Sequence, residues 1–463
     1  MALSALITPL PTRLMELGYV GIAGAVPRKK STAKERLQAA LTTSVGKANA
    51  KRLIVLRLGL GRDSMTMLAL LGQHQLMVEG KVIGPDEVDA VVFTDPGHEW
   101  DFTYALIPRV QKFCDLHGLR FIVQKKPPAE GPRGWLAWVR RQTRMRDEAK
   151  DAGKQKATFG EPYWRQDAPY SIEARAASGY YHPRAPLFED YSSKDAWIAK
   201  DDSSCTVNHK IVPNRELVAD LQVERFGLLP LVADTKRKLR YTQQAEAWAF
   251  LANAHKVKPH LMLIGYAADE LSRLKEVRTE PWVPGFDTEA YPLMEMGITK
   301  AGEDDYLRAL PGIDVEGKLV PGGFADVKKS GCRMCKEQDA AQFWMLRELD
   351  PAFFTRTAEL ERRVVARTGA WQAFFPRRFV ALDARTGKES KLLAGYRADG
   401  RQIEMKADKK TGRLYAYVWI PLEATVDLWL SEYRKSHGGR DPLVDEVARK
   451  EYRGCGASSS EAL

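Results

Sequence analysis

An apolar segment, residues 53–58, ends in the turn Gly59-Leu60-Gly61, and an apolar helix pattern follows from Arg62, Asp63 and Ser64. This succession predicts a strand, a glycine turn and a helix. Glycines let the backbone approach a ligand closely, and the N–H groups and positive dipole end of a helix N-terminus suit a phosphate. The segment therefore predicts a phosphate cradle. A plain strand-to-helix turn with a Ser or Asp cap is the alternative.

Strands and helices alternate beyond this loop. We expect strands over residues 53–58, 90–93, 119–123 and 260–264, and helices over 64–78, 100–117, 214–226 and about 235–255. Such alternation is typical of βαβ units and predicts an α/β fold, a parallel sheet with helices on both faces. No Gly-x-x-x-x-Gly-Lys-Ser/Thr occurs, which excludes a Walker-type phosphate loop.

The chain divides into three parts. We expect a helical lead-in over residues 1–50, a nucleotide-binding domain over 51–350, and an appended C-terminal α+β region over 351–463 with a strand within 413–420 and a disordered end. The middle part contains an insertion at about 126–200 that is helical over 135–150. A polar turn is expected at 203–206, and a helix over 337–348.

Charge and cysteine content narrow the environment and the partners. A net charge of +11 favours a polyanionic partner, and five cysteines do not make a disulfide scaffold, which favours a reducing cytoplasm. No run of eighteen uncharged apolar residues occurs, so we expect no membrane span. Between Lys125 and Arg165, eleven Lys and Arg residues stand against five acids, interleaved with Trp and Tyr. This favours nucleic-acid contact by phosphate neutralisation and stacking; a solvated helix face is the alternative.

Two further segments contain residues suited to ligands or metals. Asp95 and Gly97 lie in a turn after the strand 90–93, at the carboxyl edge of the sheet where α/β folds bind ligands, although an Asp there also suits a plain turn. Cys332 and Cys335 have the spacing of a chelating or redox pair, and Cys205 is the natural third ligand. Three thiolates with an open position suit a [4Fe–4S] cluster. With His209 they would hold Zn²⁺, and buried unligated thiols are the third reading.

Four segments in order carry a family resemblance: 59–64, 93–98, Cys205 with Lys210, and 330–335 before a helix with Trp344. This order resembles the phosphoadenylyl-sulfate (PAPS) reductase-like branch of the PP-loop ATP pyrophosphatase (adenine nucleotide alpha hydrolase-like) superfamily. Residues 265–273, with Gly265, Glu270 and Arg273, also match. The resemblance covers roughly residues 50–350 without the insertion. It departs at Gly59, Leu60 and Pro96, where the family has Ser, Gly and Thr.

The resemblance implies an enzyme that binds ATP with Mg²⁺, adenylates an acceptor with release of pyrophosphate, and transfers sulfur to a nucleic acid. Asp63, Ser64 and Cys205 would be catalytic, with Asp63 placing Mg²⁺. The implied nucleotide-binding residues are Gly59, Gly61, Arg62, Asp63, Ser64, Asp95, Gly97, Lys210, Gly265, Glu270 and Arg273. The alternatives are reduction of an adenylyl sulfate to sulfite, and non-catalytic nucleotide binding in a phage or defence context. Expected partners are a sulfur donor or thioredoxin-like reductant, and a second copy in a homodimer.

Overall fold

The computed structural model describes most of residues 52–449, with gaps. The described ranges are 52–130, 134–153, 184–196, 204–226, 258–271, 285–328, 330–335, 338–370, 373–375, 377–382, 389–407 and 413–449, with Ala245, Trp248 and Ala249. The expected lead-in over 1–50, most of the helix expected over 235–255 and the end of the chain lie outside these residues.

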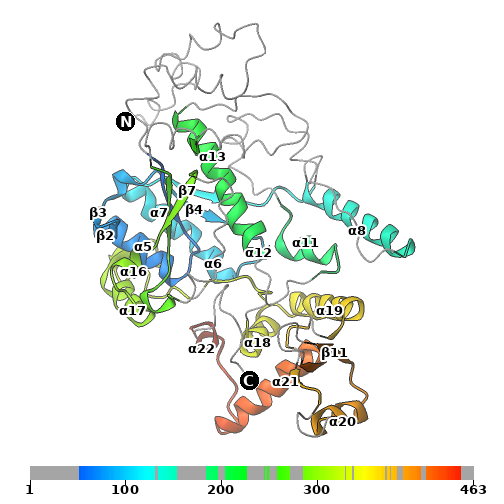
Figure 1. Ribbon diagram of the computed structural model, residues 1–463. Helices are drawn as coiled ribbons and strands as arrows, with labels where there is room; N and C mark the ends of the chain where they lie inside the picture. The colour runs from blue at the N-terminus through cyan, green and yellow to red at the C-terminus, as the bar shows by residue number, and fades with distance from the viewer. Residues whose placement is uncertain are drawn as a thin grey trace, which may run out of the picture.

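A parallel sheet of five strands forms the centre of the fold (Figure 1). Its order is β5-β4-β1-β6-β7, and every neighbouring pair is parallel. The strands are β1 Ile54–Arg57, β4 Ala90–Thr94, β5 Phe121–Gln124, β6 His260–Ile264 and β7 Asp287–Ala290. The predicted α/β class and parallel sheet are confirmed. Strand β7, with the polar sequence Asp-Thr-Glu-Ala, was not expected.

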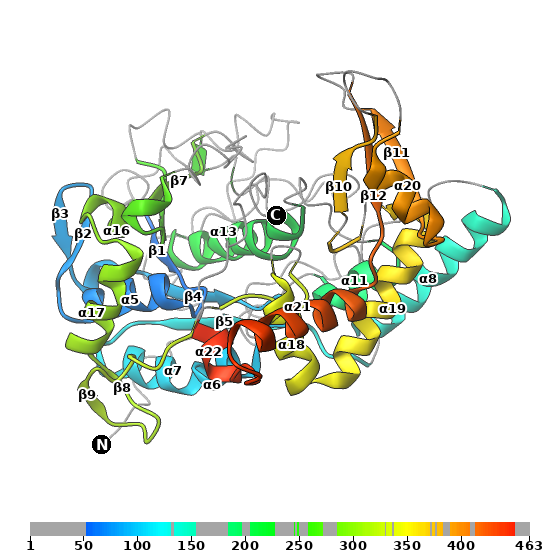
Figure 2. The same cartoon turned by 90° about the horizontal axis from the view of Figure 1, so that it is seen from below.

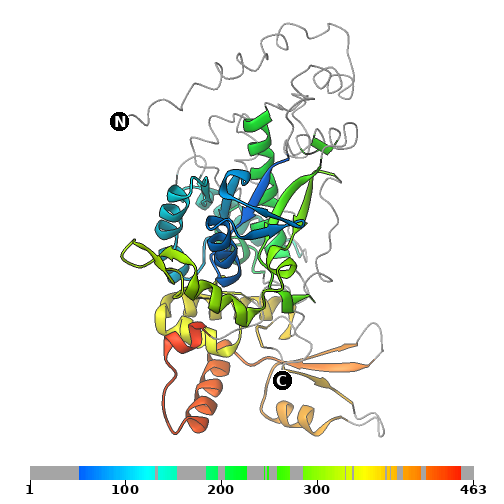
Figure 3. The same ribbon diagram turned by 90° about the vertical axis from the view of Figure 1, so that its left-hand side faces the viewer.

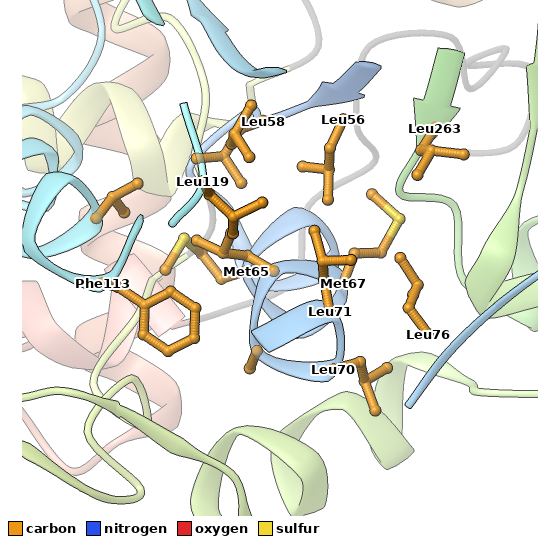
Figure 4. Close-up of a cluster of buried hydrophobic side chains, with 14 of the residues drawn as sticks. Leu56, Leu58, Met65, Met67, Leu70, Leu71, Leu76, Phe113, Leu119 and Leu263 are labelled. Carbon is orange, nitrogen blue, oxygen red and sulfur yellow. The ribbon is translucent and has the colours of Figure 1, made fainter. Parts of the chain in front are cut away.

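Helices pack on both faces of this sheet, because successive strand residues point to opposite sides. On one face, Leu56 of β1 joins a buried cluster with α5 (Arg62–Gly72) and α7 (Ile107–Leu116), and Figure 4 shows Met65, Met67 and Leu71 of α5 in that cluster. On the other face, buried His260 of β6 contacts Gln222 of α13 (Val212–Phe226). Figure 2 shows α13 and α7 on opposite sides of the strands.

Two expected helices are shorter or divided. The helix expected over 64–78 ends at Gly72, and residues 76–78 form β2 (Leu76–Val78), paired antiparallel with β3 (Lys81–Ile83). Glu79 and Gly80 make this tight turn with positive φ angles of 51° and 76°. The helix expected over 100–117 is divided into α6 (Asp101–Ala105) and α7, whose first turn contains a proline.

The insertion contains α8 (Trp135–Asp151) and α11 (Leu187–Ser192) among its described residues. The polar turn expected at 203–206 is wrong, because the chain is helical from Ser204: α12 (Ser204–Thr206) continues through a π-helical stretch, Val207–Ile211, into α13. The wider π turn comes just before Pro213, which lacks the N–H that a regular helix would use.

The remaining elements follow β7. Beside the sheet lie α16 (Pro292–Glu295), α17 (Lys300–Ala309) and the hairpin β8–β9 (Pro311–Ile313 and Leu319–Pro321). The C-terminal part contains α18 (Ala340–Leu349), α19 (Pro351–Thr368), α20 (Lys391–Ala398), α21 (Leu422–Ser436), α22 (Val444–Arg449) and a three-stranded antiparallel sheet, β10-β12-β11 (Arg377–Val380, Leu414–Val418 and Ile403–Ala407).

This C-terminal part lies at one end of the α/β body (Figure 3). A second buried cluster joins it to the α/β body. In this cluster, Trp100 from the segment after β4, Phe188 of α11 and Cys332 pack among side chains of α18 and α19. The described part of 351–463 contains helices and an antiparallel sheet, and the division of the chain into three parts stays a prediction. Within the described ranges, no helix has the length and apolar character needed to cross a bilayer.

Candidate functional site

The loop after β1 is braced by its own serine. The Ser64 hydroxyl accepts a hydrogen bond from the Gly59 N–H (3.1 Å) and donates one to the Gly61 carbonyl (3.0 Å). Gly61 is the N-cap of α5 and offers no side chain to cap the first N–H groups of the helix. Leu60 adopts a left-handed φ of 58° with its side chain buried in the core. The N-cap residue therefore supplies no side chain to the first N–H groups of α5. Main chain lies at this helix N-terminus instead.

Two other segments of the family resemblance, those with Gly265 and Ser330, lie against this loop. A Cβ atom at Gly61 would lie 2.6 Å from Ser330 Oγ, and one at Gly265 would lie 3.0 Å from the Ser64 nitrogen. Gly265 follows β6, and the loop follows β1, at the place where the strand order reverses direction. Crevices outside the carboxyl ends of strands at such a switch point are the usual ligand sites of open α/β sheets.

A charged cluster lies beside the start of α5. The Lys300 ammonium, from the first turn of α17, contacts three carboxylates: Asp63 Oδ1 at 2.5 Å, Glu270 Oε2 at 3.1 Å and Glu303 Oε1 at 3.7 Å. Arg62 pairs with Asp304 of the same helix. Of these residues, the sequence pointed to Arg62, Asp63 and Glu270, but gave no signal for Lys300 or Glu303.

Burial and close charges shift the pKa values in this cluster. Burial, with the neighbouring Asp63 carboxylate, raises the pKa of Glu303 to about 9. Burial alone would lower the pKa of Lys300, but the carboxylates of Asp63 and Glu303 raise it above its usual value. At neutral pH, Lys300 is therefore charged and Glu303 holds a proton.

The turn after β4 is fixed by local hydrogen bonds. Asp95 Oδ1 accepts from the Gly97 N–H (2.7 Å) and the Tyr104 hydroxyl (2.8 Å), so this carboxylate performs the turn-forming role that was the alternative reading. Gly97 has φ of 91°, and a Cβ there would meet Pro186 at 2.7 Å. His98 pairs with Glu189 at 2.6 Å.

The segment that contains Cys332 and Cys335 pairs with the chain just after the Asp95–Gly97 turn. Cys332 forms an isolated antiparallel bridge with Glu99, its thiol donates to Glu99 Oε1 (3.8 Å), and the Lys210 ammonium donates to the same oxygen (3.4 Å). Cys332 and Cys335 are buried, and Cys205 packs against the same apolar cluster. Cys114 is buried in the main core, as expected.

The three thiols do not form a metal site as they lie. Over the described ranges, no three His, Cys, Asp or Glu side chains converge closely enough to hold a metal ion. His209, considered as a fourth Zn²⁺ ligand, instead contacts Asp190 Oδ2 through Nε2 (3.1 Å) and the Lys126 ammonium through Nδ1 (3.4 Å). The residues in this arrangement do not fit a [4Fe–4S] cluster or Zn²⁺, and the cofactor expectation stays a prediction.

Lys126, two residues after the end of β5, is a buried cation that the sequence did not single out. Burial lowers its pKa to about 7, and burial lowers the pKa of His209 to about 3. Burial would raise the pKa of Asp190, but the hydrogen bond from His209 and the charge of Lys194 hold it below its usual value. Neutral His209 therefore donates from Nε2 to Asp190 and accepts from Lys126 at Nδ1.

The basic insertion is described only in part. On α8, Arg140, Arg141, Arg144 and Lys150 are exposed, while Trp138 is buried with the Lys194 ammonium 5.5 Å from its ring. Arg146 pairs with Asp195 near α11 (3.0 Å). The aromatic residues from Tyr163 to Tyr181 and the predicted ligand Arg273 lie outside the described residues.

Comparisons with protein-family models, with curated proteins and with solved structures find no match to this chain.

Proposed function

We propose that this protein binds ATP over the loop Gly59–Ser64 and adenylates an acceptor, releasing pyrophosphate. The observation that carries the proposal is the close approach of Gly61, Gly265 and Ser330 around an N-terminal helix end at the switch point of the parallel sheet. At Gly61 and Gly265 a side chain would collide with neighbouring backbone or with Ser330. The lack of side chains at these two positions lets the three segments meet at the N-terminus of α5, whose N–H groups suit a phosphate.

In this proposal, main-chain N–H groups at the start of α5 bind the phosphates and Ser64 keeps the turn in shape. Arg62 and Lys300, each the first residue of a helix, lie beside this helix start, although both are paired with carboxylates in this arrangement. An acceptor oxygen attacks the α-phosphate, a new P–O bond forms, and the bond to the pyrophosphate breaks. Mg²⁺, when bound, would stabilise the charge that develops on the phosphates.

Asp63 is the residue that would hold Mg²⁺. Its carboxylate belongs to the right chemical class and lies at the helix start, but in this arrangement it is engaged by the Lys300 ammonium. The three carboxylates around that ammonium are not spaced as a metal site. We therefore derive no step through a bound metal ion.

We extend the proposal to sulfur transfer onto a nucleic acid. Ser330 contacts the loop, and only Gly331 separates it from Cys332, so a thiol and the proposed nucleotide lie in one region. The exposed cations of α8 supply the charge that a phosphate backbone needs. Because the thiols do not meet as a metal site, no step passes through a cluster. The sulfur of a separate persulfide donor would attack the acceptor atom that carries the adenylated oxygen, a bond from sulfur to that atom would form, and AMP would leave with the oxygen. A thioredoxin-like dithiol would then reduce the S–S bond that links the product to the donor.

The test begins with binding of ATP to the full chain, followed by pyrophosphate release from ATP in the presence of tRNA, DNA or neither. We expect binding, and release that depends on the nucleic acid. Asp63→Asn should lose release at least tenfold, and Asp305→Asn, an exposed aspartate on α17, is the matched control. Absence of ATP binding overturns the proposal. Binding without turnover would favour a nucleotide-binding protein, and sulfite release from an adenylyl sulfate would favour the reductase.

A further inference from the structure

Three neighbouring strands bring polar side chains to the carboxyl edge of the parallel sheet. Arg57 is the last residue of β1, Glu289 belongs to β7, and Tyr266 and Tyr291 follow the ends of β6 and β7. Because successive strand residues point to opposite faces, and Leu56 packs with α5, the Arg57 side chain extends toward the other face, which α13 covers. The group therefore lies at the switch point of the sheet, on the side of β1 away from α5.

The guanidinium of Arg57 has little access to water and no hydrogen bond. Its side chain is only 20% exposed, and its ion-pair partner, Glu289 Oε1, lies 3.8 Å away, beyond hydrogen-bond distance. In the part of the chain that the structure describes, none of its N–H donors has a hydrogen-bond acceptor. Glu289 is itself engaged, because its Oε2 accepts from the Tyr291 hydroxyl at 2.6 Å. The ion pair thus offsets charge but leaves the donors unsatisfied.

A second arginine on the same face has a similar exposure and a complete ion pair. Arg215 of α13 is 18% exposed, and its Nε donates to Asp287 Oδ2 at 2.9 Å. Asp287 lies two residues before Glu289 on β7, so both pairs belong to one face of the sheet. Burial lowers the pKa of Arg57, and the charge of Glu289 offsets this only in part. Arg57 therefore lies in a costly position that a further acceptor would relieve.

The surroundings of this guanidinium lead directly to the loop after β1. The rings of Tyr266 and Tyr291 stack with 5.5 Å between their centroids and 10° between their planes, and Tyr266 is close enough to influence the charge of Arg57. Gly265, the residue before Tyr266, approaches the Ser64 nitrogen. Ligands of open α/β sheets bind outside the carboxyl ends of the strands at such a point.

We propose that Arg57 binds a phosphate-type oxyanion of a substrate at this edge of the sheet, on the α13 side of β1. A guanidinium presents paired N–H groups that match two oxygens of a phosphate, which an ammonium cannot do. The oxyanion supplies the acceptors that the protein does not. Nucleotide phosphates and the phosphates of a nucleic acid share this chemistry. The subsite does not depend on the adenylation proposed above.

The first experiment titrates inorganic pyrophosphate into the full chain at low ionic strength by isothermal titration calorimetry. Arg57→Met removes the guanidinium at similar side-chain length, so we expect binding about tenfold weaker or more. Arg57→Lys keeps the charge without the paired donors, and its affinity should lie between the two. Arg120→Met is the matched control, because Arg120 pairs with Glu224 at the amino edge of the same sheet, and it should leave the affinity unchanged.

Glu289→Gln separates a ligand role of Arg57 from a purely structural one. It removes a negative charge 3.8 Å from the guanidinium, and its amide oxygen can still accept from the Tyr291 hydroxyl. If Arg57 binds the oxyanion, this variant should bind pyrophosphate about threefold more tightly or better. If Arg57 only pairs with Glu289, Glu289→Gln and Arg57→Met lose stability in urea unfolding and the pyrophosphate affinity of Glu289→Gln is unchanged.

ATP and a single-stranded DNA oligonucleotide, titrated separately, identify the source of the oxyanion. Affinity that Arg57→Met loses for ATP alone assigns the subsite to the nucleotide, and affinity lost for the oligonucleotide alone assigns it to the nucleic acid. If ATP does not bind but pyrophosphate binding still depends on Arg57, the proposed function fails and the subsite stands. Pyrophosphate binding that is absent from the unaltered protein, or equal in folded Arg57→Met, overturns the inference.

Discussion

Two glycines of one loop provide a sharp test of how the site is assembled. A Cβ atom at Gly61 would lie 2.6 Å from Ser330 Oγ, 3.1 Å from Ser330 N and 3.3 Å from Ser330 Cβ. One at Gly59 would meet Ser330 Oγ at 3.7 Å and Ser64 Oγ at 3.9 Å, which are ordinary contacts. Because Gly61→Ala forces Ser330 away, it should cost about 1–3 kcal/mol. Gly59→Ala should stay within about 0.5 kcal/mol.

Urea unfolding followed by tryptophan fluorescence gives both values, provided that the m-value is unchanged. Ser330→Gly removes two of the three colliding atoms and leaves the backbone nitrogen. It should therefore recover part of the loss in the Gly61→Ala background, with a coupling of about 0.5–3 kcal/mol in a double-mutant cycle. If Gly61→Ala is as harmless as Gly59→Ala, or Ser330→Gly recovers nothing, then Ser330 does not lie against the loop.

Three further predictions concern buried residues. Leu60 has a positive φ and a buried side chain, so Leu60→Ala should lower the free energy of unfolding by about 2–5 kcal/mol. Leu60→Gly relieves the backbone strain and should cost about 1 kcal/mol less than Leu60→Ala. The reverse order in urea unfolding would contradict this. His260→Ala should cost about 3 kcal/mol by the same assay, because it leaves a cavity beside Trp248 and removes the acceptor of the Leu53 N–H. Burial raises the pKa of Glu361 to about 7, so the stability that its proton supplies is full below the unfolded pKa of 4.5 and is lost as pH rises through 7. Glu361→Gln, which replaces an acceptor of two backbone N–H groups, should therefore destabilise less at pH 8 than at pH 5, by up to about 3 kcal/mol; an unchanged difference would refute this.

The sequence was most informative where a local pattern decides the structure. Strands β1, β4 and β6 are short apolar runs bounded by turns, and the sequence predicted each within one or two residues. Their residues are buried on both faces, so the run is continuous and easily found. Helix α19 also has a local signal in its sequence, although it was not among the expected helices. A proline lies in its first turn, Gly369 follows its end, and its buried apolar residues have helical spacing.

Other features depend on tertiary contacts that no local pattern records. Residues 76–78 have the apolar character of a helix face, yet the Glu79-Gly80 turn and pairing with β3 make them a strand. Lys300 and Glu303 lie in a polar helix whose sequence resembles any exposed helix. Both residues lie beside Asp63 because the first turn of α17 packs against the first turn of α5. The sequence likewise could not separate Lys126 from the exposed lysines of the insertion.

The two charged clusters make opposite demands on a polyphosphate at the carboxyl edge of the sheet. Beside α5, carboxylates gather round Lys300 and would repel phosphate oxygens unless a cation arrives with them. Beside β5, three cations, Lys126, Arg184 and Lys194, stand against the carboxylates of Asp190 and Asp95, a balance less unfavourable to an anion. Ser330 and Cys332 lie between, touching the loop on one side and Glu99 on the other. In the proposed function, a triphosphate that brings its own divalent cation would meet the first cluster without this repulsion, and a nucleic-acid phosphate would lie nearer the second.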